Sequence, residues 1–139
     1  MPTDPAITLI RPEQLTTKAP YAYAAVTGPG RFVFTAGACP LDLDGTVVAV
    51  GDVTGQTQQV MANLVVALQA AGAQLTDVVK TTVYVASSRQ EDLGAAWTVV
   101  RAAFGDHDAP GTLLGVTVLG YDNQLVEVEA VAIRPHRSS

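Results

Sequence analysis

Two glutamates near the C-terminal end, Glu127 and Glu129, have the spacing of a pair that could carry out acid–base chemistry. They alternate with Val126, Val128 and Ala130, so on a β-strand both side chains point to the same face. Residues two apart on a strand lie about 6.5–7 Å apart. Carboxylates at that spacing can transfer protons or hold a water molecule for attack. A solvated outer face, or an ion pair at a subunit interface, is the alternative, and the sequence leaves both open.

Cys39 is the one thiol in the chain and a candidate nucleophile. Thiolate chemistry needs a neighbouring base, and the histidines are His107, in the run Asp106-His107-Asp108, and His136, near the C-terminus. That run follows a predicted helix and precedes a proline, so we expect a solvated loop there. We therefore expect Cys39 to be a small apolar side chain that is buried or lines a cleft. Two histidines and one cysteine without ligand spacing predict no metal site.

The segment Asp42-Leu-Asp-Gly-Thr46 is similar to the D-x-D-G-T signature of the haloacid-dehalogenase phosphatases, in which the first aspartate attacks phosphate and both aspartates hold magnesium. That chemistry requires the first aspartate at the end of a buried parallel strand, and Pro40 interrupts the run just before it. Aspartate and glycine are also common in tight turns. We therefore expect a turn at Asp44-Gly45, without phosphatase or calcium chemistry.

The composition limits the partners and the compartment. Hydrophobic residues make up 48% of the 139 residues and charged residues 15%, which suits one folded domain with a core. The net charge is -5 and the lysines and arginines are scattered, so we expect no binding to nucleic acid. A single cysteine, a start without signal-peptide features and the lack of a long apolar run predict a cytoplasmic protein with no membrane span.

Periodicity and turn signals predict an α+β domain with two helices. Asp52 or Thr54 caps the first helix and Gly72 ends it, and the second helix covers 90–104. The expected strands are 7–10, 21–26, 31–36, 46–50, 78–86, 113–119 and 125–133. A turn signal at 28–30 predicts that the second and third strands form a hairpin. Two helices cannot cover both faces of such a sheet, so its apolar open face needs another layer, which oligomerisation usually provides.

Four segments of the chain carry a recognisable set of motifs. They are Arg31-Phe-Val-Phe-Thr-Ala-Gly37 with Pro40-Leu-Asp42, the helical Gln56-Thr57-(x)2-Val60-(x)2-Asn63-Leu64, Ala71-Gly-Ala73 followed by the strand 77–85, and Leu125-Val-Glu-Val-Glu-Ala130. In this order and spacing they resemble the RidA/YjgF family, the reactive-intermediate deaminases. The similarity covers about residues 18–134, so we expect 1–139 to be a single RidA-like domain with short flexible ends.

The resemblance implies a chorismate-mutase-like α+β fold, with a mixed, mostly antiparallel sheet and two helices packed on one face. It also implies a homotrimer that binds a small organic ligand in a cleft between each pair of subunits. Members of the deaminase branch hydrolyse imines and enamines released by pyridoxal-phosphate enzymes: water adds to the imine carbon and ammonia leaves. No metal or organic cofactor takes part in that reaction, so we expect none here.

The family's site residues carry over only in part. Tyr21 matches the cleft tyrosine, Gly37 the glycine whose backbone faces the ligand, and Glu127 the glutamate that positions the attacking water. The substrate-binding arginine does not match, because the family's Pro-Ala-Arg-Ser/Thr reads Ala109-Pro-Gly-Thr112 here, with Gly111 in the arginine's place. Arginine binds a carboxylate through two charge-assisted hydrogen bonds, and glycine offers none.

The other side chains expected around the ligand carry no charge. They are Tyr21, Cys39, Trp97, Thr112 and Leu113. Such a lining favours an uncharged or aromatic ligand over a small 2-imino acid. Lys18 is the candidate for a replacement cation.

These observations favour a RidA-like hydrolase for a labile imine or enamine that has no essential carboxylate, with water positioned by Glu127. Two alternatives stay open. One is a non-catalytic trimer that binds a small ligand in the same cleft. The other is a scaffold or chaperone-like interaction protein.

Overall fold

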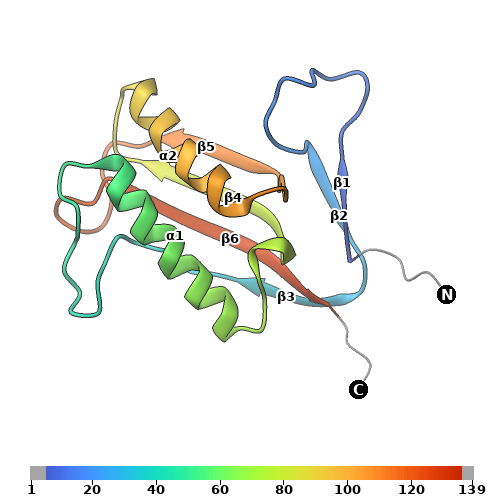
Figure 1. The fold of residues 1–139 in the computed structure, drawn as a ribbon, viewed down its shortest axis with the longest axis horizontal. Helices are drawn as coiled ribbons and strands as arrows, with labels where there is room; N and C mark the ends of the chain where they lie inside the picture. The colour runs from blue at the N-terminus through green and yellow to red at the C-terminus, as the bar shows by residue number, and fades with distance from the viewer. Residues whose placement is uncertain (1–5, 136–139) are drawn as a thin grey trace.

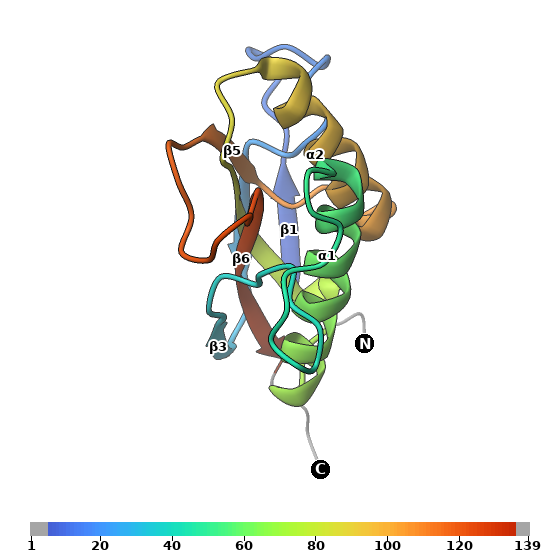
Figure 2. The same ribbon diagram turned by 90° about the vertical axis from the view of Figure 1, so that its left-hand side faces the viewer.

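Two helices pack on one face of a four-stranded sheet in the computed structural model, and a two-stranded sheet stands at one end (Figures 1 and 2). The structure describes residues 6–135, so the N-terminal start and His136 lie outside the described residues. The helices are α1 (Val53–Ala70), the short 3-10 helix η1 (Leu75–Asp77) and α2 (Gln90–Phe104). The strands are β1 (Ile7–Ile10), β2 (Ala24–Thr27), β3 (Gly30–Phe34), β4 (Val78–Val85), β5 (Gly111–Gly115) and β6 (Val126–Pro135). The predicted α+β class with two main helices is confirmed.

The four-stranded sheet is mixed and mostly antiparallel, as expected. Its order is β3-β6-β4-β5, with β6 antiparallel to both β3 and β4, whereas β4 and β5 run parallel. The parallel pair is joined through α2, because two parallel strands need a long crossover connection. Both helices cover the same face, which leaves the other face open (Figure 2). In this strand order β6, which carries Glu127 and Glu129, lies between β3 and β4.

The hairpin predicted from 21–26 and 31–36 is wrong. β2 pairs with β1, with Thr27 opposite Ile7, and β3 pairs with β6. The two runs therefore belong to different sheets, and the turn signal at 28–30 lies where the chain passes from one sheet to the other. A local turn pattern marks a change of direction, but it does not determine which strand becomes the partner.

The strand predicted at 46–50 is also wrong, since this segment forms one isolated bridge, between Leu41 and Val47. Ala49 has a φ of 50° and Gly51 a φ of 81°, both in the left-handed region. That backbone conformation is incompatible with an extended strand. The alternating valines and alanine of this segment gave the β-like pattern, but the chain follows a loop.

The turn expected beside this loop is confirmed. The Asp42 carboxylate accepts hydrogen bonds from the backbone N–H groups of Asp44 (2.9 Å) and Thr46 (3.0 Å). A short acidic side chain that bonds the backbone two residues on is typical of such turns. The segment therefore has a structural explanation that needs no phosphate or magnesium.

Helix α1 begins and ends as its sequence predicts. The Asp52 carboxylate accepts the Gly55 N–H at 3.0 Å, which caps the first turn. Beyond the last turn, Gly72 has a φ of 83°. The buried stripe of the helix consists of Val60, Met61, Leu64 and Leu68. This stripe packs on the sheet and forms the centre of the core.

The last two strands differ from their predicted bounds. β5 covers Gly111–Gly115 rather than 113–119, and β6 covers Val126–Pro135 rather than 125–133. Along β6, Val126, Val128 and Ala130 are buried beneath the helices. Glu127 and Glu129 therefore both lie on the open face, as their alternation predicts.

The open face of the sheet is apolar at one side and polar at the other. On β3, Phe32 and Phe34 are 60% and 74% exposed, with ring centroids 6.1 Å apart. Phe34 lies opposite Val131 of β6. Thr82 and Tyr84 of β4 lie opposite the two glutamates. Among the described residues, no helix is both long and apolar enough to cross a membrane.

Candidate functional site

Glu127 lies at the start of β6, where the segment after β3 runs beside it. The backbones of Ala38 and Val128 exchange hydrogen bonds of 2.7 and 3.2 Å, which holds that segment against the strand. The Glu127 Oε1 atom accepts the Cys39 thiol at 3.4 Å and the Gln124 Nε2 amide at 3.1 Å. We call Gly37, Cys39, Gln124 and Glu127 the glutamate cluster. Two donors on one oxygen fix the orientation of the carboxylate.

Gly37 leaves the space that this carboxylate occupies. A Cβ atom at position 37 would lie 2.2 Å from Glu127 Oε2, a distance that real Cβ atoms do not adopt. The carboxylate thus packs directly against the glycine backbone. The structure thus places Gly37 beside Glu127, and the expected role of its backbone in facing the ligand stays a prediction.

Among residues 6–135, the side chain that accepts a hydrogen bond from the Cys39 thiol is the Glu127 carboxylate. The pKa of its thiol is raised from 9.0 to about 11, mainly by burial and also by the hydrogen bond to Glu127 and the negative charge of that carboxylate. The thiol is therefore protonated at neutral pH and is a poor nucleophile. His107 is engaged elsewhere, with its Nε2 atom 2.7 Å from the carbonyl oxygen of Val78.

Glu129, the second carboxylate of the strand, is committed to a different partner. Its Oε1 atom accepts the Tyr84 hydroxyl at 2.5 Å. This hydrogen bond is the main reason that the pKa of Tyr84 is raised. The two glutamates thus share a face but have different partners, and Glu127 is the one beside Gly37.

The other predicted site residues gather around a separate hollow. Tyr21, Trp97, Gly111, Thr112 and Leu113 line an open cavity of about 440 Å³. We call these five residues the tryptophan hollow. Tyr21 and Trp97 meet edge to face, with ring centroids 6.0 Å apart and an angle of 87° between the planes. Such a wall suits a flat, uncharged group.

Trp97 lies against the backbone of Gly111. A Cβ atom at position 111 would lie 3.1 Å from Trp97 Cη2 and 2.9 Å from the Thr81 hydroxyl oxygen. Both contacts are tighter than ordinary van der Waals contact, so a side chain at position 111 requires the indole and the Thr81 hydroxyl to shift.

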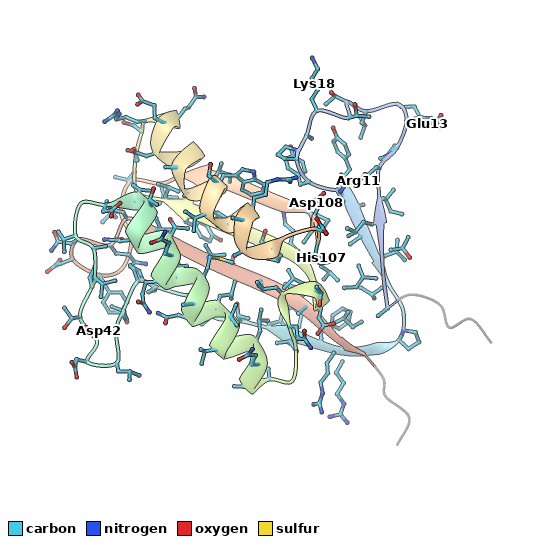
Figure 3. All side chains as sticks on the ribbon, in the orientation of Figure 1. Arg11, Glu13, Lys18, Asp42, His107 and Asp108 are labelled. Atoms are coloured by element: carbon cyan, nitrogen blue, oxygen red, sulfur yellow. The ribbon has the colours of Figure 1, made fainter. Side chains whose placement is uncertain are left out.

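Three cations lie near these elements, and none of them lines the hollow. Lys18 stands on the loop between β1 and β2 and points away from the rest of the molecule (Figure 3). Arg101, one helical turn after Trp97, donates to the Pro20 carbonyl oxygen and to Asp108 at 3.1 Å. Lys80 donates to the Thr112 hydroxyl at 2.5 Å from the open face. The sequence did not indicate Arg101 or Lys80. Lys80 meets Thr112, and Arg101 meets Pro20, only because the fold brings distant parts of the chain together.

The loop 106–108, predicted to be solvated, is instead anchored. Asp108 accepts Arg11 at 2.7 Å as well as Arg101, and the His107 ring contacts β4 (Figure 3). Within residues 6–135, no three His, Cys, Asp or Glu side chains gather closely enough to hold a metal ion. The site residues therefore consist of a carboxylate, a thiol, amides and aromatic rings.

The glutamate cluster and the tryptophan hollow do not meet within one chain. Gly111 pairs with Thr81, whereas Glu127 pairs with Tyr84, three residues farther along β4. That offset corresponds to about 10 Å along the strands, and β5 lies two strands, roughly 9.5 Å, from β6. Gly111 also lies on the helix side of the sheet, and Glu127 on the open face. One small ligand cannot touch both groups of residues in a single chain.

Proteins of similar sequence cover nearly the whole of this chain. The family model described as Endoribonuclease L-PSP matches residues 12–134. A RutC family protein of Pyrococcus horikoshii is 34% identical over 112 residues, 81% of this chain and 86% of that protein. A 2-iminobutanoate/2-iminopropanoate deaminase of Salmonella typhimurium is 33% identical over 125 residues, 86% of this chain and 94% of that enzyme.

Solved structures agree with the sequence comparison. A Rid-family protein of unknown function from Yersinia pestis superimposes with a TM-score of 0.86 at 32% identity, covering 92% of this chain and 98% of that one. The YjgF protein of E. coli gives a TM-score of 0.66 at 29% identity, with coverage of 86% and 91%. Sequence, fold and the motifs around Gly37 and Glu127 thus lead to one conclusion: this chain belongs to the RidA/YjgF family.

Proposed function

We propose that this protein is a homotrimeric hydrolase, with one chorismate-mutase-like domain per chain, that converts an uncharged imine or enamine to a carbonyl compound and ammonia. The open sheet face supports the trimer. Phe32 and Phe34 are well exposed beside Val131, and an apolar sheet face is normally covered by another layer. The relatives of known reaction that resemble this chain, such as the Salmonella enzyme, act on 2-imino acids.

The active cleft lies between two subunits. One chain supplies the glutamate cluster and its neighbour supplies the tryptophan hollow. The separation of the two groups within a chain supports this arrangement, because neither group by itself provides both a positioned carboxylate and an apolar binding surface. No cofactor or metal is needed for the reaction.

The reaction follows from the carboxylate and its free oxygen. Glu127 Oε2 orients a water molecule and accepts its proton while the oxygen adds to the imine carbon. The imine reacts as its iminium ion, protonated at nitrogen by solvent, so the C=N π electrons pass to nitrogen and the product is a neutral carbinolamine. Glu127 then gives the proton it took from water to the nitrogen. The C–N bond breaks as the C=O bond forms, ammonia leaves, and the hydroxyl proton passes back to Glu127. An enamine enters the same sequence after protonation at carbon.

The substrate has no carboxylate that must be bound. The observation that supports this proposal is the glycine at position 111, where the resemblance leads us to expect the family's arginine, with the Trp97 indole packed close to its backbone. Tyr21, Trp97 and Leu113 provide aromatic and aliphatic surface. Among the described residues, the cation that reaches the hollow is Lys80, whose ammonium group is bonded to the Thr112 hydroxyl. A flat or aromatic R group on the imine gains contact area here, whereas a small 2-imino acid loses its anchor.

A non-catalytic trimer that binds a small ligand in the same cleft is the second candidate. The contacts of Glu127 favour it, because Cys39 and Gln124 occupy Oε1 and only one carboxylate oxygen is left to hold water. A ligand that takes that place by accepting or donating a hydrogen bond would be bound and not hydrolysed.

One experiment separates the candidates. Trp97 is the single tryptophan of the chain, so its fluorescence reports directly on the hollow. The protein is titrated with benzylamine-derived and 2-iminopropionate imines, generated by amine and amino-acid oxidases, and ammonia release is measured alongside fluorescence. We expect a fluorescence change and ammonia release with the aromatic imine, and loss of the release in Glu127→Gln. A fluorescence change without ammonia release would favour the binding protein. The absence of both a fluorescence change and ammonia release would contradict both candidates.

A further inference from the structure

A buried amide stands directly behind the Glu127 carboxylate. The Gln124 side chain is only 3% exposed, and each of its polar atoms has a partner. Its Nε2 donates to Glu127 Oε1 and to the Val126 carbonyl oxygen, both at 3.1 Å. Its Oε1 accepts the backbone N–H of Tyr121 at 3.1 Å. The amide is therefore fixed on one side by backbone groups and presents a donor to the carboxylate on the other.

A second buried amide fixes the backbone on both sides of Gln124. Gln56, from α1, is completely buried. Its Nε2 donates to the Asn123 carbonyl oxygen at 2.9 Å, and its Oε1 accepts the Leu125 N–H at 2.7 Å. Asn123 has a φ of 67°, in the left-handed region, so the loop holds an uncommon conformation at this point. The two bonds from Gln56 compensate for that conformation and keep Gln124 in register with Glu127.

We propose that Gln124 is a positioning residue that sets which oxygen of Glu127 is available to water, and that Gln56 holds Gln124 in place. This inference rests on the proposed hydrolytic role of Glu127. A carboxylate on a partly exposed strand can rotate and exchange its two oxygens. The donor from Gln124, together with the Cys39 thiol, ties down Oε1, so Oε2 remains beside Gly37 with no hydrogen-bond donor from residues 6–135.

The contacts of Gln124 distinguish a role in positioning Glu127 from a role in stabilising the loop alone. The backbone bonds of Gln124 stabilise the loop whatever Glu127 does. The bond to Oε1 affects only the carboxylate. Removal of the amide donor should therefore change the turnover step while substrate binding in the tryptophan hollow stays the same, because the hollow shares no residue with this network.

The first test replaces Gln124 by Met, which keeps the approximate length of the side chain and removes the donor to Glu127 together with the bonds to the backbone of Tyr121 and Val126. We expect kcat for the aromatic imine to fall about tenfold or more with KM unchanged. In a crystal structure of the variant, the Glu127 carboxylate should leave its contact with Cys39 or occupy more than one rotamer. Gln69→Met, an exposed glutamine on α1, is the matched control and should alter neither quantity. An unmoved carboxylate in Gln124→Met would overturn the proposal, whether or not the protein hydrolyses imines.

Gln124→Glu provides the second test and also serves if the Met variant fails to fold. It keeps the acceptor for Tyr121 and donates to Glu127 only when its new carboxyl is protonated. We expect the kcat of this variant to approach that of the wild-type protein at low pH and to fall as the pH rises, with no such change in the wild type. A pH profile parallel to that of the wild type would refute a positioning function. If the wild-type protein releases no ammonia at all, the hydrolytic proposal fails, and the crystal structure of the variant still decides on the position of Glu127.

Discussion

The Cη2 atom of Trp97 lies 3.1 Å from the point that a Cβ atom on Gly111 would occupy. A side chain at position 111 therefore requires Trp97 and Thr81 to shift by a few tenths of an ångström, so the effect of a change at position 111 depends on the residue at position 97.

This relationship predicts the outcome of restoring the arginine. Gly111→Arg alone should lower the melting temperature and give no gain with 2-iminopropionate, because the new side chain meets Trp97 and Thr81. Gly111→Arg combined with Trp97→Asn should raise kcat/KM for 2-iminopropionate at least about tenfold. A charged hydrogen bond contributes ~1.5–3 kcal/mol, and about 1.4 kcal/mol corresponds to a factor of ten. Trp97→Asn alone is the control. Equal activity of the single and double arginine variants would show that the indole is no obstacle.

Gly37 should be as sensitive as Glu127 itself. In Gly37→Ala the added methyl group would lie 2.2 Å from Glu127 Oε2, so the carboxylate has to move. Misplacement of a reacting group by about 1 Å can reduce a rate about 10²-fold, and we expect a loss of that size in ammonia release. Gly94→Ala is the matched control, since a Cβ there meets open space on α2. That change should stabilise the helix by ~0.5–1 kcal/mol and leave activity unchanged. Full activity in Gly37→Ala would place the carboxylate elsewhere during turnover.

The alkylation rate of the Cys39 thiol should depend on the neighbouring Glu127 carboxylate. Alkylation by iodoacetamide follows the thiolate, so its rate in the native protein should rise with a midpoint at a pH of about 11 rather than the ordinary 9.0. Glu127→Gln should lower this midpoint, because two of the causes that raise the pKa of the thiol are the bond to Glu127 and its charge. The chain unfolded in urea gives the reference midpoint. A native midpoint near the reference would mean that the thiol and the carboxylate are not neighbours.

The same shift has a consequence for stability. The pKa of Cys39 is higher in the folded chain than in the unfolded chain, so above the unfolded value the folded state holds the proton more tightly. The stabilisation is complete below pH 9 and is lost as the pH rises through about 11. The unfolding free energy of Cys39→Ala, followed by denaturant titration across this range, should therefore depend less on pH than that of the wild-type protein. Parallel pH profiles would contradict the assignment.

The apolar open face predicts the oligomeric state. Size exclusion with light scattering should give three times the chain mass of 14.4 kDa. Phe34→Asp places a charge on the exposed part of β3 and should dissociate the trimer at micromolar concentration. Leu43→Asp is the control, because Leu43 is fully exposed in the turn before α1 and lies outside the strands of the sheet. A wild-type monomer would remove the proposed cleft, and an intact trimer in Phe34→Asp would place the interface elsewhere.

Local patterns in the sequence were sufficient to predict the helices and the central strands of the sheet. The α1 cap at Asp52, its end at Gly72 and the alternation along β6 depend on neighbours within a few residues, and all three are confirmed. The pairing of β2 with β1 depends on a segment far away in the chain, and here the predicted hairpin was wrong. The valines of 46–50 gave a β-like pattern that the left-handed Ala49 does not allow.

The contacts among the candidate site residues could be predicted from the sequence only in part. Resemblance placed Gly37 and Glu127 at the site, and the structure puts their atoms in contact. It also placed Tyr21 and Trp97 at the site, and these rings do meet. Gln124 and Gln56 gave no signal, because a buried glutamine cannot be distinguished from an exposed one until the fold shows its partners.

The amide network of Gln56 has a further consequence for folding. Its hydrogen bonds to Asn123 and Leu125 join residues 67 and 69 positions apart, and the bond between Cys39 and Glu127 spans 88 positions. Contacts between such distant positions form late, because long loops must close first. The orientation of the Glu127 carboxylate is thus completed only when the first helix meets the last strand. During refolding, helical circular dichroism should return before the slow alkylation of Cys39 that marks its native environment.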